Sequence, residues 1–152
     1  MTEEMNVLVE YILVVEDNPD HARLIIKTLK DSGHLLNEII HLKNGEEAIS
    51  FLKKEGKFRD EKRSLPMLIL LDLKMPLKNG FDVLKEIKRD VNLRCIPVIM
   101  LTTSSRTEDI QTALSLGAND FIVKPFKFPD FSEKLAKVGC YWVTVSNAKS
   151  AL

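Results

Sequence analysis

The chain is poor in the residues that mark several classes of protein. Its 152 residues include two cysteines, Cys95 and Cys140, which lie far apart and outside any CxxC or Cys/His spacing. Neither a disulfide framework nor a zinc site is therefore expected. The three histidines, His21, His34 and His41, form no pair with metal-ligand spacing. We expect them at surface or loop positions.

An excess of charge and long apolar runs are also lacking. The 22 basic residues balance 22 acidic ones, so nothing favours nucleic acid or an anionic membrane. No apolar run approaches the roughly 20 residues that cross a bilayer, and the acidic amino terminus lacks the basic segment of a secretory signal. There is no G-x-G-x-x-G or P-loop pattern for nucleotides. We expect a cytoplasmic protein without nucleic-acid or membrane partners.

What the chain does contain is the composition of a globular domain, with 45% apolar and 29% charged residues. A chain of this length can bury one core. We expect a single domain over residues 1–152, with a core at about 10–140. Residues 53–64, with six basic and three acidic side chains, form a charged loop insertion, either simply solvated or a partner-contact surface. Residues 139–152 are expected to be a C-terminal extension.

Strand and helix signals alternate five times along the chain. Apolar runs predict strands at 11–15, 38–42, 67–71, 97–101 and 120–123. Asn18 before Pro19, and Asn44 three residues before Glu47, are helix starts. Further starts are expected at the turn 78–80, at a capping box from Ser105 to Glu108, and at Pro129.

The apolar spacing within these helices predicts which side chains face the core. Val91 is expected on the inner face with Leu84 and Ile87, and Leu114 with Ala113. Strands that alternate with helices of this length imply right-handed crossovers. The predicted fold is therefore α/β: one doubly wound domain with a five-stranded parallel sheet and helices on both faces.

Polar residues of complementary chemistry follow four of the five strands. Asp72 ends the most apolar run, Glu16 and Asp17 follow the first strand, Thr102 the fourth, and Lys124 the fifth. Open α/β sheets bind ligands beyond the carboxyl ends of their strands. We therefore expect these side chains to converge on one site.

Three carboxylates at one site need compensation. Two such charges about 4 Å apart repel by about 4 kcal/mol at an effective dielectric near 20, so the cluster must protonate, pair with a cation or bind a metal. Oxygen ligands in this number suit Mg²⁺. The reaction that uses all the groups is phosphoryl transfer onto Asp72, with Lys124 pairing with the phosphoryl oxygens and the Thr102 hydroxyl donating to them.

Four segments resemble the CheY-like receiver domain of two-component response regulators. They are VVEDN (14–18), LLDLKMP (70–76), PVIMLTT (97–103) and VKPF (123–126), and the resemblance runs from about Tyr11 to about Val138. It implies the flavodoxin-like strand order 2-1-3-4-5 with five helices. The 53–64 insertion and the C-terminal YWVTV further resemble single-domain regulators that are paired with bacterial phytochromes.

The resemblance implies a role for each site residue. Asp72 would accept phosphate from the phosphohistidine of a sensor histidine kinase or a phosphotransfer protein. Mg²⁺ would be held by Asp17, Asp72 and the backbone carbonyl of Lys74, with Glu16 acting through water. Lys124 would contact the phosphate, and its bond to the following proline would be cis.

A switch is implied as well. Thr102 would swing to the phosphate and Phe121 would follow inward, biasing an equilibrium between two packings of the surface around the fourth and fifth strands. Lys74 and Ser104 border the site and could tune hydrolysis. Departures from the family are Glu16, where many members have aspartate, and Phe121, which lacks the hydroxyl of the commoner tyrosine.

The last helix carries apolar residues at heptad spacing, and Trp142 and Val145 extend it beyond the expected domain edge. They either cap the core or form a two-fold homodimer contact. We expect a signalling protein that turns over no external substrate. Two alternatives remain: a phosphorylation-independent binding scaffold of the same fold, and an aspartyl-phosphate phosphohydrolase, although Lys74 stands where such enzymes commonly place a second acid.

Overall fold

The computed structural model describes residues 10–31, 38–124 and 133, and every structural statement refers to these residues. They form one parallel sheet in the order β2-β1-β3-β4-β5, as expected. The strands are β1 (Tyr11–Val15), β2 (Glu38–Leu42), β3 (Leu68–Asp72), β4 (Val98–Thr102) and β5 (Asp120–Val123). Strands β3 and β4 begin and end one residue later than the sequence predicted, which makes Asp72 and Thr102 the last residues of their strands.

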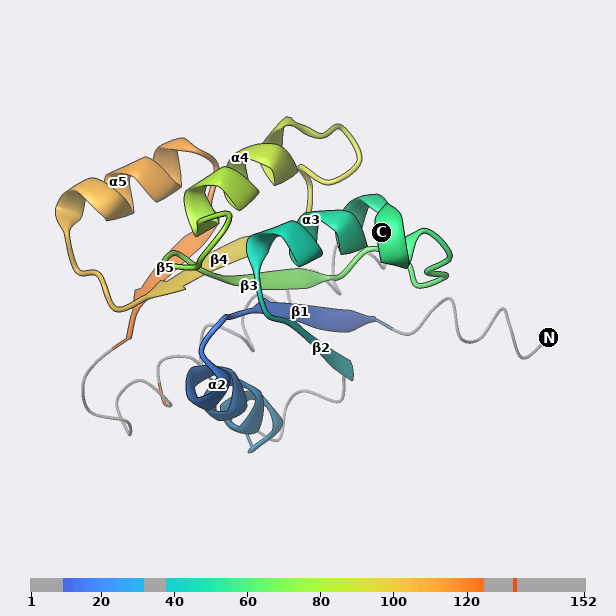
Figure 1. Ribbon diagram of the computed structural model, residues 1–152. Coiled ribbons are helices and arrows are strands. Elements are labelled where there is room, and N and C mark those ends of the chain that lie inside the picture. The colour runs from blue at the N-terminus through green and yellow to red at the C-terminus, as the bar shows by residue number, and fades with distance from the viewer. Residues whose placement is uncertain (1–9, 32–37, 125–132, 134–152) are drawn as a thin grey trace, which may run out of the picture.

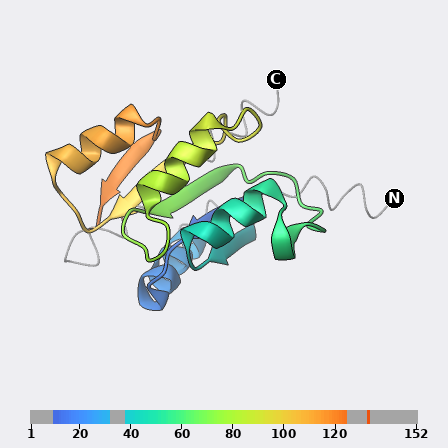
Figure 2. The same ribbon diagram turned by 45° about the horizontal axis from the view of Figure 1, so that its top comes forward.

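The helices cover both faces of the sheet. Figure 1 shows α3 (Gly45–Lys53), α4 (Gly80–Arg89) and α5 (Thr107–Ser115) on one face and α2 (Pro19–Asp31) on the other, and Figure 2 gives the same arrangement. The fifth expected helix, with Trp142 and Val145, lies outside the described residues except for residue 133. Within the described part of the chain, no helix is long and apolar enough to cross a membrane.

The core is divided between the two faces of the sheet. Every residue of β1, β3 and β4 is buried, as expected for central strands with both faces covered. Along β1, Leu13 and Val15 belong to the apolar cluster beneath α3 and α4, while Ile12 and Val14 pack in the cluster that contains Leu29 of α2. These two layers hold the strand ends, and therefore the polar residues that follow them, in fixed positions.

Asparagine side chains begin three of the helices, and two of them were predicted as caps. The Oδ1 atom of Asn18 accepts from the backbone N–H groups at the start of α2, and Asn44 does the same for α3. Asn79, in the predicted turn, accepts from the N–H of Asp82 in α4 at 3.0 Å. Each cap satisfies backbone donors that a helix leaves free at its first turn.

The capping box predicted at Ser105 is wrong. Helix α5 begins at Thr107, and the residue before it, Arg106, makes no side-chain cap. The serine one position earlier, Ser104, donates its hydroxyl to Asp109 at 2.5 Å. The helix therefore begins one residue later than a cap at Ser105 would start it, and the Ser104–Asp109 contact joins the end of β4 to the first turn of α5.

Two predicted inward-facing residues lie at the surface instead. Val91 is 68% exposed because α4 ends at Arg89 and Asp90 is extended, so the helical spacing no longer applies. Leu114 is 51% exposed because Ala113, which is fully buried, occupies the inward position on α5. Adjacent residues of a helix point about 100° apart, so Leu114 is turned away from the direction in which Ala113 faces the core.

The charged insertion at 53–64 is attached to the body of the domain. The Tyr11 hydroxyl donates to the Ser64 carbonyl at 2.7 Å, and Phe58, in the 3₁₀ turn η1 (Gly56–Phe58), packs edge-on against Phe51 with ring centroids 5.3 Å apart. Since Tyr11 is the first residue of β1, the end of the insertion is fixed at the amino end of the sheet. That the insertion contacts a partner stays a prediction.

Gly80 brings the start of α4 against the backbone of Asp72. A Cβ at this position would lie 2.4 Å from the Asp72 carbonyl oxygen and 2.8 Å from the Leu73 Cα. The Gly80 N–H donates to the Leu73 carbonyl at 2.8 Å. Only glycine allows this approach, and it places the amino end of α4 beside the end of β3.

We predict that Gly80→Ala lowers the free energy of unfolding by about 1–3 kcal/mol or more, because the added methyl group must displace backbone. Chemical denaturation of both proteins measures the change. Gly56→Ala is the matched control: its Cβ would meet nothing within 4 Å, so only the strain of its positive φ remains, about 1 kcal/mol. If Gly80→Ala lowers the free energy of unfolding less than Gly56→Ala does, the packing argument is contradicted.

Candidate functional site

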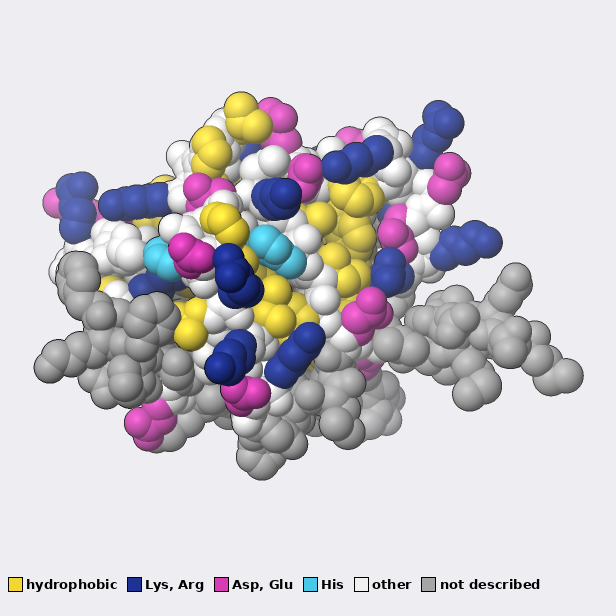
Figure 3. Space-filling view, turned by 60° about the horizontal axis from the view of Figure 1, so that its bottom comes forward, with side chains coloured by type: hydrophobic (Ala, Val, Ile, Leu, Met, Phe, Trp, Pro, Cys, Tyr) yellow, Lys and Arg dark blue, Asp and Glu magenta, His cyan; other side chains and the backbone are white. Residues whose placement is uncertain are grey.

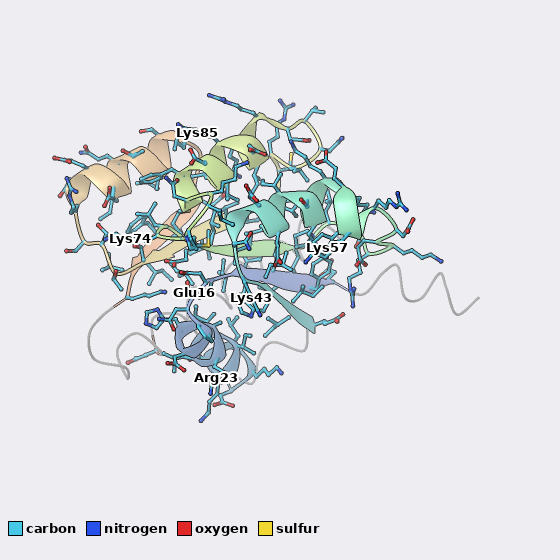
Figure 4. All side chains as sticks on the ribbon, viewed as in Figure 1. Glu16, Arg23, Lys43, Lys57, Lys74 and Lys85 are labelled. Atoms are coloured by element: carbon cyan, nitrogen blue, oxygen red, sulfur yellow. The ribbon has the colours of Figure 1, made fainter. Side chains whose placement is uncertain are left out.

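The predicted site residues meet at the carboxyl edge of the sheet. Glu16 and Asp17 directly follow β1, Asp72 and Thr102 end β3 and β4, and Lys124 directly follows β5. All the strands are parallel, so their ends lie at one edge. Figure 4 labels Glu16 and Lys74 at this end of the molecule, whereas Lys57 of the insertion lies toward the other end.

Three carboxylates form the centre of the site. Oxygen atoms of Glu16, Asp17 and Asp72 all lie within 4.8 Å of one another, with Glu16 and Asp72 buried and Asp17 exposed. The Glu16 Oε2 atom is buried and has no hydrogen-bond partner among the described residues. A buried carboxylate oxygen without a donor is costly, and a divalent cation with its water shell would satisfy it. The residues present therefore fit a hard divalent ion.

Lys124 supplies the opposite charge. Its side chain is buried, and its Nζ atom lies 3.0 Å from Glu16 Oε1 and 3.8 Å from Asp72 Oδ1. The Lys124 backbone N–H donates to the Thr102 carbonyl, which fixes the residue beside the end of β4. One ammonium thus faces three carboxylates, and the cluster keeps an uncompensated negative charge that a cation could neutralise.

The buried charges leave Asp72 in an unusual protonation state. Burial, followed by the neighbouring Glu16 and Asp17 carboxylates, raises the pKa of Asp72 to about 8, although Lys124 acts in the opposite direction. Without a bound cation the Asp72 carboxyl is therefore largely neutral at pH 7. A cation or a further positive charge would favour the ionised form.

The loop after β4 holds the Thr102 hydroxyl. Thr102 is fully buried, and its Oγ1 atom accepts from the backbone N–H of Ser104 at 3.1 Å. Phe121 of β5 is partly buried and packs against the apolar cluster beneath α3 and α4. The structure therefore places Thr102 at the site edge and Phe121 on the neighbouring strand, while their joint movement stays a prediction.

A groove of about 530 Å³ opens beside the carboxylates. Asp17 and the exposed Lys74 lie along one part of it, and Arg106 and Asp109 of the β4–α5 region along another. The groove therefore reaches the acidic cluster through Asp17. That the Lys74 carbonyl binds a cation stays a prediction, and the expected cis bond after Lys124 lies outside the described residues.

Two histidines contact the site, which the sequence did not indicate. His21 Nδ1 lies 3.2 Å from Glu16 Oε1 and 3.2 Å from Lys124 Nζ. His41 Nε2 donates to the Glu16 backbone carbonyl at 2.8 Å. The expectation of surface or loop positions gave neither histidine a role at the site: His21 is partly exposed on α2 and His41 lies in β2, and both contact Glu16; His34 lies outside the described residues.

Comparison with known proteins defines the class. The family model for the response regulator receiver domain matches residues 12–136, and the chain belongs to this family. It is 39% identical over 133 residues to the probable methanogenesis regulatory protein FilR2 of Methanothrix harundinacea, covering 87% of this chain and 83% of FilR2. Receiver domains are components of two-component signalling, so the resemblance drawn from the sequence is confirmed.

The narrower resemblance to phytochrome-associated regulators is also confirmed. The chain is 36% identical to response regulator Rcp1 of Synechocystis over 132 residues, or 87% of this chain and 88% of Rcp1; the Mn²⁺-bound form of Rcp1 superposes with a TM-score of 0.81, covering 88% and 94% of the two chains. The phosphorylated cyanobacterial phytochrome response regulator RcpA has a TM-score of 0.82 and 35% identity, covering 90% and 95%.

The raised pKa of Asp72 predicts an unusual dependence of stability on pH. The pKa of an unfolded aspartate is about 4, so the folded protein binds the extra proton between about pH 4 and pH 8. The free energy of unfolding should therefore fall across this range as pH rises. Asp72→Asn removes this pH dependence. Its free energy of unfolding should therefore rise relative to that of the wild type toward pH 8, by on the order of 2 kcal/mol.

Thermal or urea unfolding in a chelator-containing buffer measures this difference in the free energy of unfolding between the variant and the wild type. Asp82→Asn is the matched control, since Asp82 is an exposed residue of α4 outside the carboxylate cluster. Its difference from the wild type should stay constant between pH 5 and pH 8. If the difference between Asp72→Asn and the wild type is constant or becomes smaller as pH rises, the raised pKa of Asp72 is contradicted.

Proposed function

We propose that this chain is a phosphoacceptor receiver domain in which Asp72 takes a phosphoryl group from the phosphohistidine of a sensor histidine kinase. The observation that carries the proposal is the burial of Asp72 beside Glu16, Asp17 and Lys124, with Lys124 Nζ 3.8 Å away. This arrangement combines a nucleophile, a cation site and a fixed positive charge. A binding scaffold has no physical need to bury such charges together.

The reaction follows from this arrangement. An Asp72 oxygen attacks the phosphorus atom, the bond from phosphorus to the donor nitrogen breaks, and the departing imidazole takes up a proton. Lys124 then pairs with the phosphoryl oxygens, since phosphoryl transfer depends mainly on positioning and charge stabilisation. The product is an aspartyl phosphate on the buried edge of the sheet.

Mg²⁺ is the cofactor that we propose for this site. Asp17, Asp72 and the Lys74 carbonyl would hold it directly, and Glu16 through water. When bound, the ion offsets the negative charge of the carboxylates and of the phosphoryl oxygens. It would also lower the pKa of Asp72 from about 8, so that the carboxylate is ionised at neutral pH.

Thr102 and Phe121 form the proposed switch. The Thr102 hydroxyl would leave its contact with the Ser104 N–H and donate to the phosphate. Phe121 would then follow inward. The phosphate thereby favours one of two packings of this surface, and the surface acts on a downstream protein.

The proposed partners are proteins. A sensor histidine kinase, phytochrome-like by analogy with RcpA, or a phosphotransfer protein would supply the phosphoryl group in the cytoplasm. Homodimerisation through the last helices is a further proposal. We propose no turnover of an external substrate, because the phosphoryl group ends on the protein itself. Lys74 and Ser104 border the site and could tune the hydrolysis of the aspartyl phosphate.

Incubation with Mg²⁺ and acetyl phosphate tests the function. We predict a mass increase of one phosphoryl group by intact-protein mass spectrometry, because Asp72 lies in the carboxylate cluster that the groove reaches through Asp17. Asp72→Asn should show no increase, and Asp82→Asn should match the wild type. An increase that persists in Asp72→Asn would remove Asp72 as the acceptor. No increase in the wild type would favour the scaffold alternative.

Mg²⁺ itself should stabilise the fold. At about ten times its dissociation constant it adds about 1.4 kcal/mol to the free energy of unfolding, measurable as a rise in Tm that EDTA reverses. Asp17→Asn should abolish most of this rise, because Asp17 is the exposed ligand of the cluster, and Asp82→Asn should keep it. An unchanged response in Asp17→Asn would contradict the assigned site.

A further inference from the structure

His21 occupies an unassigned position at the mouth of the site. It lies in the first turn of α2, and its side chain is 38% exposed. Figure 3 views the face of the molecule that carries α2 and shows histidine side chains beside acidic and basic ones at the surface. His21 therefore borders solvent on one side and the buried charges of the site on the other.

The contacts of His21 depend on which of its nitrogen atoms carries hydrogen. With hydrogen on Nδ1 the ring donates to Glu16 Oε1 at 3.2 Å, and with hydrogen on Nε2 the Nδ1 atom accepts from the Lys124 ammonium at 3.2 Å. The positive charge of Lys124 beside Nδ1 favours the second arrangement, because it repels an N–H group at that atom. Burial and the Lys124 charge lower the pKa of His21, in agreement with a neutral ring. The Glu16 Oε1 atom, 3.2 Å from Nδ1, accepts from the same ammonium.

His21 and Glu16 therefore compete with Asp72 for Lys124. The Nζ atom lies 3.0 Å from Glu16 Oε1 and 3.2 Å from His21 Nδ1, both hydrogen-bond distances. Its distance to Asp72 Oδ1 is 3.8 Å, which is too long for a hydrogen bond. The hydrogen-bond acceptors within reach of the ammonium are thus Glu16 and His21, and neither is the residue that would carry the phosphate.

We propose that His21 is a positioning residue that holds the Lys124 ammonium on Glu16 and so slows phosphorylation of Asp72. The inference rests on the proposed function, because it concerns the same site. For Lys124 to reach a phosphoryl group on Asp72, its bond to His21 must be given up. Removal of the His21 acceptor lowers that cost and leaves Lys124 free to move toward Asp72.

The first test is the rate of phosphorylation by acetyl phosphate at saturating Mg²⁺, followed by intact mass. His21→Ala should be phosphorylated about three- to tenfold faster than the wild type, which corresponds to the loss of one hydrogen bond from a partly exposed charged group. Arg23→Ala is the control on the same helix, since Arg23 is 80% exposed and pairs with Asp20. It should leave the rate unchanged.

Two conservative variants separate positioning from a merely structural role. The terminal atoms of an asparagine side chain are two bonds from Cβ, as Nδ1 is, whereas those of glutamine are three bonds away, as Nε2 is. His21→Asn should therefore keep the wild-type rate, and His21→Gln should resemble His21→Ala. Equal rates for Asn and Gln, or a rate of His21→Ala at or below that of the wild type, would overturn the inference.

A crystal structure of His21→Ala gives an independent readout. The distance from Lys124 Nζ to the nearest Asp72 oxygen should shorten from 3.8 Å to hydrogen-bond range, and an unchanged distance would overturn the inference. This readout does not depend on phosphorylation. A wild type that acetyl phosphate fails to modify would contradict the proposed function, whereas a modified wild type with an unmoved Lys124 in the variant would contradict only the role of His21.

Discussion

The ion cluster around the Lys124 ammonium is the interaction on which the rest of the site depends. Glu16 and Lys124 are separated by 108 residues and come from strands that are not neighbours in the sheet, yet their charged atoms lie 3.0 Å apart. The contact requires every intervening strand to keep its register, because a slip of one residue would turn a side chain to the opposite face. Two packed apolar layers provide that register, so the stability of the core and the chemistry of its edge have the same origin.

Much of this architecture could be predicted because it depends on local patterns. The short apolar run that ends at Asp72 is typical of a central strand of a parallel sheet covered on both faces. The asparagine caps at Asn18 and Asn44 need only the side chain and the next turn of backbone. Once the strands are aligned, convergence of Glu16, Asp72, Thr102 and Lys124 follows from the geometry of a parallel sheet.

The remaining features depend on distances that no local pattern contains. His21 contacts Lys124 from 103 residues away, and whether its ring reaches the site depends on the rotation of α2 against the sheet. The false capping box and the exposed Val91 have a related cause, since each follows from a loop or helix end that differs by one or two residues from the predicted one. A side chain at a helix end is the hardest to place, because its direction changes by about 100° with each residue.

The charged insertion is attached at the amino end of the sheet, so changes in the insertion are separated from changes at the candidate site. Its last residue is bound to Tyr11, at the start of β1, whereas the proposed reacting groups follow the opposite ends of the strands. Substitutions or length differences in the insertion are therefore expected to leave the proposed phosphoryl-transfer site unchanged.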